Sequence, residues 1–143
     1  MKVIFVCTGN TCRSPMAEGI ARSYLQGHEI FSRGIMAQEG APIATHTQKL
    51  LEQHDHPIPE GATPFSNDDT DADLILTMTS SHAHHIRMLY GESLSVMTLS
   101  EYVGETGEVP DPFGGSYETY IETFEQLTFL IQQLQKKLDT ELV

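Results

Sequence analysis

The sequence predicts an α/β fold: a doubly wound, four-stranded parallel sheet with helices on both faces. Short apolar runs alternate with amphipathic segments along the chain, an order typical of β-α units in a parallel sheet. The first run, Val3 to Val6, is apolar throughout, as expected of a strand that is buried on both faces. Because the 143 residues contain no internal repeat and no low-complexity stretch, we expect one domain over 1–143.

The expected elements follow the order β-α four times, and right-handed crossovers leave few topologies for that order. Ser14 is expected to cap the first helix and Gly27 to end it, while Thr79 or Ser80 caps the third. Strands are expected over residues 2–6, 29–35, 74–78 and 93–99. Helices are expected over 15–26, 42–54, 80–90 and 117–139, with long loops over 55–70, which ends in a short helical turn, and 100–116.

The charge of the chain excludes some partners. It carries 8 basic and 20 acidic residues, a net charge of −12, so we expect no nucleic acid and no anionic membrane as a partner, since both require a basic face. No apolar run approaches the length of a transmembrane helix. The two cysteines lie five positions apart in one loop, so a disulfide between them could not join distant parts of the fold. This favours a reducing, cytoplasmic setting. We expect a cytoplasmic monomer without an export signal.

A short polar loop follows the first strand, and its residues suit a bound oxyanion. Cys7 begins the loop and Arg13 ends it six positions later, just before a helix. A loop bent between a strand and a helix turns its backbone N–H groups inward. These groups, the helix N-terminus and Arg13 together form a cradle for a tetrahedral anion. Gly9 permits the unusual torsions that such a loop needs, and Asn10 tolerates a left-handed conformation.

Cys7 is the candidate nucleophile at the floor of this cradle. A free thiol is mostly protonated at neutral pH, so a nucleophilic cysteine needs its thiolate stabilised. The inward N–H groups, the helix N-terminus and Arg13 all favour the thiolate, and Ser14 can donate its hydroxyl proton to it. A buried cysteine at a strand end is the alternative, but it would not require Arg13 and Asn10 at these spacings. The loop therefore predicts attack of Cys7 on a bound phosphoryl group.

A second polar segment, Asp111-Pro112, lies in the loop that follows the fourth expected strand. The carboxyl ends of parallel strands meet at one edge of the sheet, where ligands bind. We therefore expect Asp111 close to the Cys7 loop in spite of the separation in sequence. A carboxylate placed there can act first as a general acid and then as a base. Taken alone, Asp111 would be assigned as a turn residue before proline.

The run Cys7-Thr8-Gly9-Asn10-Thr11-Cys12-Arg13-Ser14 resembles the signature loop of low-molecular-weight protein tyrosine phosphatases, and Asp111-Pro112 resembles their general-acid loop. The resemblance extends from the first strand to the last helix. It implies the family's doubly wound fold, a phosphocysteine intermediate, and no metal or other cofactor. The catalytic residues are then Cys7, Arg13 and Asp111. The expected substrate-binding residues are Thr8, Gly9, Asn10, Thr11, Cys12, Ser14 and Phe113.

Two departures from the family pattern concern the substrate. Family members that act on phosphotyrosine usually carry a bulky aliphatic residue where Thr11 stands. They often place aromatic residues after Asp-Pro, where this sequence has Phe113 and two glycines. The combination resembles the bacterial protein arginine phosphatase branch, in which the matching Thr makes room for the guanidinium and the Asp pairs with it. We expect a phosphatase that hydrolyses phosphoarginine on proteins, with phosphotyrosine as the alternative substrate.

The resemblance also implies that Cys12 can form a reversible disulfide with Cys7, which protects the nucleophile from over-oxidation; a small packed residue is the alternative. Arsenate reductases of the same fold relay their disulfide through additional cysteines, and none follows Cys12 here. A thiol redox switch would not need Arg13 or Asp111. A non-catalytic phosphoprotein-binding module would not need Cys7.

Two polar clusters raise the question of a metal. His82, His84 and His85 lie at the start of the third expected helix without an acidic or cysteine partner nearby, so we expect solvated helix residues. The acidic run over 68–73 lacks the glycine and the terminal glutamate of a calcium loop and is expected to be a charged helix start. The sequence predicts no metal site.

Overall fold

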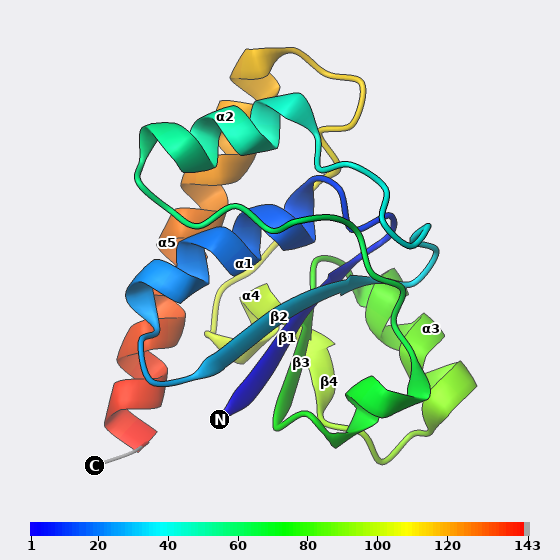
Figure 1. Cartoon of the computed structure of the whole chain (residues 1–143). Coiled ribbons are helices and arrows are strands. Elements are labelled where there is room, and N and C mark those ends of the chain that lie inside the picture. Colours follow the sequence, from blue (N-terminus) through cyan, green and yellow to red (C-terminus); the bar gives the residue numbers. More distant parts are fainter. Residues whose placement is uncertain (142–143) are drawn as a thin grey trace.

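The four strands form one parallel sheet in the order β2-β1-β3-β4, as Figure 1 shows. The computed structural model describes residues 1–141. The strands are β1 Lys2–Cys7, β2 Glu29–Gly34, β3 Leu74–Thr77 and β4 Val96–Thr98. In the sheet, β2 lies on one side of β1 and β3 lies on the other side, so the strand order reverses its direction at β1. The carboxyl ends of β1 and β3 therefore flank the crevice where doubly wound sheets bind ligands, and the predicted fold class is confirmed.

Helices cover both faces of the sheet. Figure 1 places α1, α2 and α5 on one side and α3 on the other. Among residues 1–141, no helix combines the length and the apolar character needed to cross a membrane. The helices are α1 Arg13–Tyr24, α2 Thr45–Gln53, the 3-10 helix η1 Asn67–Asp71, α3 Ser80–Tyr90, α4 Leu99–Tyr102 and α5 Tyr117–Glu141.

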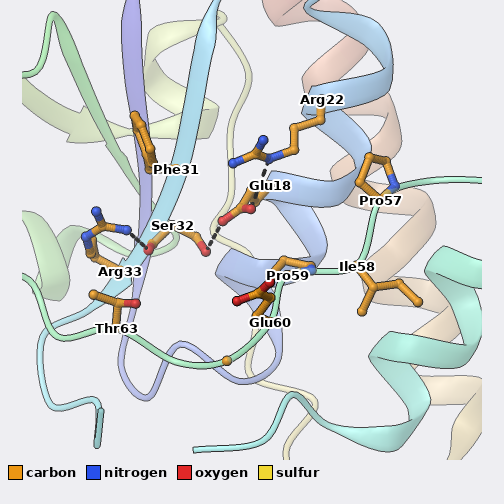
Figure 2. A pocket seen from close by; sticks show the side chains of 11 residues that line it. Glu18, Arg22, Phe31, Ser32, Arg33, Pro57, Ile58, Pro59, Glu60 and Thr63 are labelled. Atoms are coloured by element: carbon orange, nitrogen blue, oxygen red, sulfur yellow. Dashed lines mark hydrogen bonds and ion pairs between the residues drawn. The ribbon is translucent and has the colours of Figure 1, made fainter. Parts of the chain in front are cut away.

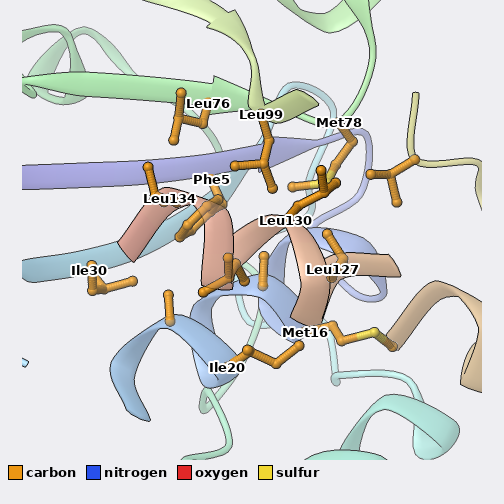
Figure 3. Close-up of a cluster of buried hydrophobic side chains, with 14 of the residues drawn as sticks. Phe5, Met16, Ile20, Ile30, Leu76, Met78, Leu99, Leu127, Leu130 and Leu134 are labelled. Atoms are coloured by element: carbon orange, nitrogen blue, oxygen red, sulfur yellow. The ribbon is translucent and has the colours of Figure 1, made fainter. Parts of the chain in front are cut away.

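The alternation of side chains along β1 divides the core into two layers, because successive residues point to opposite faces of a sheet. Val3 and Phe5 pack in the layer beneath α1 and α5. Ile4 and Val6 pack in the layer beneath α3. Figure 3 shows the first layer, in which Phe5 lies between the sheet and the helices. All four side chains are fully buried, so the end of β1, at Cys7, is fixed from both sides.

Three element boundaries differ from the prediction. Strand β4 covers only Val96–Thr98 rather than 93–99, because residues 92–94 form a turn and a bend before it. Helix α1 begins at Arg13, and the hydroxyl of Ser14 caps no N–H group because it contacts the Cys7 thiol instead. Helix α2 begins only at Thr45, since Ala44 is extended and its N–H donates to the carbonyl of Thr11.

The fourth difference lies after β4, in the segment expected to be a loop. Thr98 ends the strand and caps helix α4, which was not predicted. Its Oγ1 accepts a hydrogen bond from the N–H of Glu101 in the first turn of that helix. At the same edge of the sheet, after β3, Thr79 caps α3 as predicted, and its side-chain oxygen accepts a hydrogen bond from the N–H of His82.

Candidate active site

A cleft of about 240 Å³ opens at the carboxyl end of β1. Two loops that are far apart in the sequence form it: the loop between β1 and α1, and the loop that precedes α5. The prediction that Asp111 lies near the Cys7 loop is therefore confirmed. The residues that line the cleft are Cys7, Thr8, Gly9, Thr11, Cys12, Arg13, Asp111 and Phe113.

Cys7 lies at the base of the cleft, and polar hydrogens surround its sulfur. The thiol is only 3% exposed. Its Sγ lies 3.0 Å from Ser14 Oγ and accepts a hydrogen bond of 3.3 Å from the backbone N–H of Asn10. The N-terminus of α1 begins at Arg13, in the same loop, and a helix N-terminus favours negative charge. This arrangement stabilises a thiolate, the reactive form of a cysteine nucleophile.

Asn10 holds the loop in shape from below the cleft. Its φ of 56° is in the left-handed region, which asparagine tolerates. The side-chain Nδ2 donates to Ser14 Oγ at 2.7 Å and to Ser32 Oγ at 3.0 Å, while Oδ1 accepts from the N–H of Thr63 at 2.8 Å. Because Ser14 Oγ accepts a hydrogen bond from Asn10, its own hydrogen can be donated either to the Cys7 sulfur at 3.0 Å or to the carbonyl of Arg33 at 3.3 Å. Asn10 and Ser14 thus lie behind the cleft rather than on its wall.

The same hydrogen-bond chain continues behind the loop into a second cavity of about 400 Å³. Figure 2 shows Ser32 and Arg22 on either side of Glu18. Ser32 Oγ donates to Glu18 Oε1 at 2.7 Å, and Arg22 Nε donates to Glu18 Oε2 at 3.0 Å. A buried carboxylate needs such partners to offset its desolvation. The chain anchors Asn10, and therefore the Cys7 loop, to β2 and α1.

Sequence reasoning missed Ser32 and Glu18. One signal was available for Ser32, because it is a polar residue at an inward-facing position of β2, with a side chain that is buried. Glu18 gave a weaker signal, as a single acidic residue among the buried residues of α1.

Arg13 is oriented so that one edge of its guanidinium is left for an anion. The side chain is buried. Nη1 donates to the carbonyl of Val109 at 3.0 Å, and Nη2 lies 3.7 Å from Asp111 Oδ2. Nε is buried and has no hydrogen-bond partner among residues 1–141. Nε and Nη2 form a fork that matches two oxygens of a phosphoryl group, and such a group would satisfy the unpaired Nε–H.

Asp111 lies at the rim of the cleft, above the buried Arg13. Its side chain is 52% exposed, and Oδ1 accepts a hydrogen bond of 3.0 Å from the N–H of Phe113. This turn leaves Oδ2 directed to the cleft side, near Arg13. Phe113 is 77% exposed beside it. A proton carried by Asp111 would be delivered at the mouth of the cleft, where a leaving group departs.

Cys12 lies in the same loop as a buried thiol. Its Sγ lies 3.3 Å from the hydroxyl of Tyr120. Burial raises the pKa of the Cys12 thiol, and burial together with the Cys12 contact raises the pKa of Tyr120. Both groups therefore stay protonated at neutral pH, and no disulfide joins Cys12 to Cys7. Of the two cysteines, Cys7 has the surroundings of a nucleophile.

The expectation that the α3 histidines are solvated is wrong for His82. His82 is buried, and its Nε2 lies 2.9 Å from Thr8 Oγ1 in the Cys7 loop. His82 lies at the start of α3, where its backbone N–H also donates to the Thr79 cap. His84, two residues further along α3, is exposed. Within residues 1–141, no three His, Cys, Asp or Glu side chains are grouped as metal ligands.

Gly34 is required where the end of β2 meets the Cys7 loop. A Cβ at this position would lie 2.6 Å from the carbonyl oxygen of Thr8 and 2.9 Å from the backbone nitrogen of Asn10. Because both are backbone atoms, we expect Gly34→Ala to displace the loop. The free energy of unfolding should fall by about 1–3 kcal/mol, and kcat/KM for an aryl phosphate by at least about tenfold.

The matched control for this variant is Gly61→Ala, whose Cβ would be no closer than 3.4 Å to its neighbours. Thermal unfolding and initial-rate kinetics measure both variants. An active Gly34→Ala enzyme with an unchanged unfolding midpoint would show that the loop does not depend on this close approach.

The class of protein follows from this geometry together with a comparison of the sequence with known families. The family described as low molecular weight phosphotyrosine protein phosphatase matches residues 2–143. The chain belongs to this family and is a cysteine-dependent protein phosphatase.

Individual members of the family are similar over nearly the whole chain. The low molecular weight protein-tyrosine-phosphatase PtpB of Staphylococcus epidermidis is 48% identical over 137 residues, which cover 96% of this chain and 99% of PtpB. The structure of YwlE arginine phosphatase from Geobacillus stearothermophilus matches with a TM-score of 0.93 at 35% identity, over 98% of this chain and 94% of that one. A C7S mutant of YwlE arginine phosphatase, with a phosphorylated active-site serine, matches with a TM-score of 0.93 at 37% identity, over 97% and 96% of the two chains.

Proposed function

We propose that this enzyme hydrolyses phosphoarginine residues on proteins through a phosphocysteine intermediate on Cys7. In the first step the Cys7 thiolate attacks phosphorus, so that an S–P bond forms and the P–N bond to the arginine side chain breaks. Arg13 binds two phosphoryl oxygens through Nε and Nη2, and the inward N–H groups of the loop bind the third. The phosphorylated active-site serine of the C7S mutant of YwlE supports a covalent intermediate at this position.

Asp111 serves both steps from the rim of the cleft. It gives a proton to the departing guanidine nitrogen, so that the arginine side chain leaves as a neutral guanidine rather than as an anion. In the second step the Asp111 carboxylate takes a proton from a water molecule. That water attacks phosphorus, the S–P bond breaks, and inorganic phosphate and the Cys7 thiolate are released. The position of Oδ2 beside Arg13 supports this assignment.

The observation that favours phosphoarginine is Thr11 on the wall of the cleft. Where relatives that act on phosphotyrosine carry a bulky aliphatic side chain, Thr11 offers less volume and a hydroxyl group. A guanidinium is planar, polar and cationic, so it benefits from a polar wall and from the carboxyl oxygens of Asp111 at the rim. A phenyl ring benefits from neither. The match to YwlE arginine phosphatase supports the same substrate.

Phosphotyrosine is the second candidate, and two observations favour it. PtpB, which is 48% identical, is a protein-tyrosine-phosphatase. Phe113 is exposed beside the cleft and offers a surface on which an aromatic ring could stack.

Turnover of two matched peptides tests the choice of substrate. The peptides differ only in carrying phosphoarginine or phosphotyrosine at one position, and kcat/KM is measured for the wild type and for Thr11→Ile. We expect the wild type to prefer phosphoarginine and Thr11→Ile to reverse the preference. The ethyl group that replaces the hydroxyl fills the space for the guanidinium and provides an apolar surface for the ring. A shift of about tenfold to a hundredfold corresponds to one or two methyl groups in a pocket.

Thr11→Ser is the matched control, since it keeps the hydroxyl and adds no volume, and it should keep the wild-type preference. Preference for phosphotyrosine in the wild type and in both variants would assign the chain to phosphotyrosine and leave the chemistry of Cys7 unchanged.

We also propose that the enzyme works in a reducing compartment such as the cytoplasm and that oxidation inhibits it reversibly. Peroxide would convert the Cys7 thiolate to a sulfenic acid, and the Cys12 thiol would displace water to close a Cys7–Cys12 disulfide. Both thiols are free and lie in the same loop, which supports this pairing.

A further inference from the structure

His82 links α3 to the Cys7 loop, although the two residues in contact are 74 positions apart. It lies in the first turn of α3, is 5% exposed, and places Nε2 2.9 Å from Thr8 Oγ1. Its other ring nitrogen, Nδ1, is buried and has no hydrogen-bond partner among residues 1–141. The roles assigned to Cys7, Arg13 and Asp111 leave this contact unexplained.

The lowered pKa of His82 leaves its imidazole neutral near pH 7. Burial is the main cause that lowers the pKa of His82, and the charge of Arg13 lowers it further, to about 4. The carboxylates of Glu108 and Asp111 and the ring of His85 act on it more weakly. A neutral imidazole carries one N–H, so only one of its two nitrogens can be a donor.

The surroundings of the ring favour the tautomer with its proton on Nε2. A proton on Nδ1 would be a buried donor without an acceptor, which costs the free energy of its desolvation. With the proton on Nε2, the ring donates to Thr8 Oγ1, and no buried N–H of the ring is left without an acceptor. The Thr8 oxygen then accepts, and its own hydrogen is free.

Thr8 is exposed and lines the cleft immediately after Cys7. We propose that His82 is a positioning residue: its Nε2–H holds Thr8 Oγ1 so that the Thr8 hydroxyl donates its hydrogen to an oxygen of the phosphoryl group. This inference rests on the proposed site, in which that group is bound above Cys7. A donor aimed at charge that develops during the transfer raises the rate more than it strengthens ground-state binding.

A double-mutant cycle tests the proposal with para-nitrophenyl phosphate, so that the outcome does not depend on the choice between phosphoarginine and phosphotyrosine. We expect Thr8→Val and His82→Leu each to lower kcat about tenfold with little change in KM. The double variant should be no slower than Thr8→Val alone, because His82 acts only through the Thr8 hydroxyl. His82→Gln keeps an N–H near the position of Nε2 and should restore most of the rate. His84→Leu, on the exposed side of α3, is the control and should match the wild type.

Other outcomes overturn the proposal. If the losses in kcat multiply in the double variant, His82 and Thr8 act independently, and if Thr8→Val is as fast as the wild type, the hydroxyl donates nothing. A wild type that does not hydrolyse para-nitrophenyl phosphate would instead reject the proposed function, which keeps the two failures distinct.

The tautomer can be measured in the wild-type protein, which covers the case in which His82→Leu does not fold. Nitrogen NMR of the histidine rings distinguishes a protonated from a bare nitrogen. We expect the His82 signals of a protonated Nε2 and a bare Nδ1 at pH 7. A proton on Nδ1 would overturn the proposal, because Thr8 would then have to donate to the ring and could not donate to the substrate.

Discussion

Cys7→Ser is expected to abolish turnover while leaving the fold intact. Ser14 and the N–H of Asn10 contact the Cys7 sulfur and can stabilise a thiolate, but an alcohol is far too weak an acid to be ionised by the same contacts at neutral pH. Loss of a nucleophile costs about 10⁴- to 10⁶-fold in kcat. Steady-state kinetics with an aryl phosphate measure the loss.

The fold of this variant should survive because serine is slightly smaller than cysteine and can make the same hydrogen bonds. Its thermal unfolding midpoint and its affinity for inorganic phosphate should stay close to those of the wild type, since Arg13 and the loop N–H groups bind the anion. Turnover within about tenfold of the wild-type rate would mean that Cys7 is not the nucleophile.

Asp111→Asn is expected to slow the enzyme in a manner that depends on the leaving group. A poor leaving group needs the proton of Asp111 as its bond to phosphorus breaks, whereas a good one can leave as an anion. Across a series of aryl phosphates, kcat/KM should fall about 10²- to 10³-fold for the poorest leaving groups and far less for the best. The slope of log kcat/KM against the acidity of the leaving group measures this directly.

The matched control is Asp111→Glu, which keeps the carboxyl group and changes its reach. Its slope should resemble that of the wild type. Equal losses for all leaving groups in Asp111→Asn would contradict a general acid and would leave Asp111 as a partner of Arg13 only.

Most of what could be predicted about the fold and the site came from residues that are contiguous in the sequence. The apolar run of β1, the loop from Cys7 to Arg13 and the helix after it are contiguous in the sequence, so their order alone indicated a buried strand that leads into an anion site. The approach of Asp111 could also be predicted, because the topology of a parallel sheet brings strand ends together at one edge.

What the sequence could not predict depends on contacts between distant residues. Ser32 and Glu18 support Asn10 from behind the cleft, and nothing in their local sequence indicates which side chain they would meet. His82 lies on a helix with two further histidines nearby, and only the packing of α3 against the sheet distinguishes the buried ring from the exposed one.

Of the two roles predicted for Ser14, the contact with the Cys7 sulfur is confirmed and the cap on α1 is wrong. A serine before proline at a helix start is a strong N-cap signal. Here the partner that the hydroxyl takes is the Cys7 sulfur, seven residues earlier in the chain. The Ser14 hydroxyl therefore contacts the Cys7 sulfur and does not cap the N–H groups of α1.

The most direct test of the account is to trap the intermediate. Asp111→Asn should slow the second step, because it lacks the base that activates water, so the phosphoenzyme should accumulate with an aryl phosphate that has a good leaving group. The reaction is quenched, digested with trypsin and analysed by mass spectrometry. We predict one added phosphoryl group on the peptide of residues 3–13, assigned by fragmentation to Cys7. Rapid release of the aryl alcohol without any phosphoryl group on Cys7, or with the group on another residue, would contradict the account.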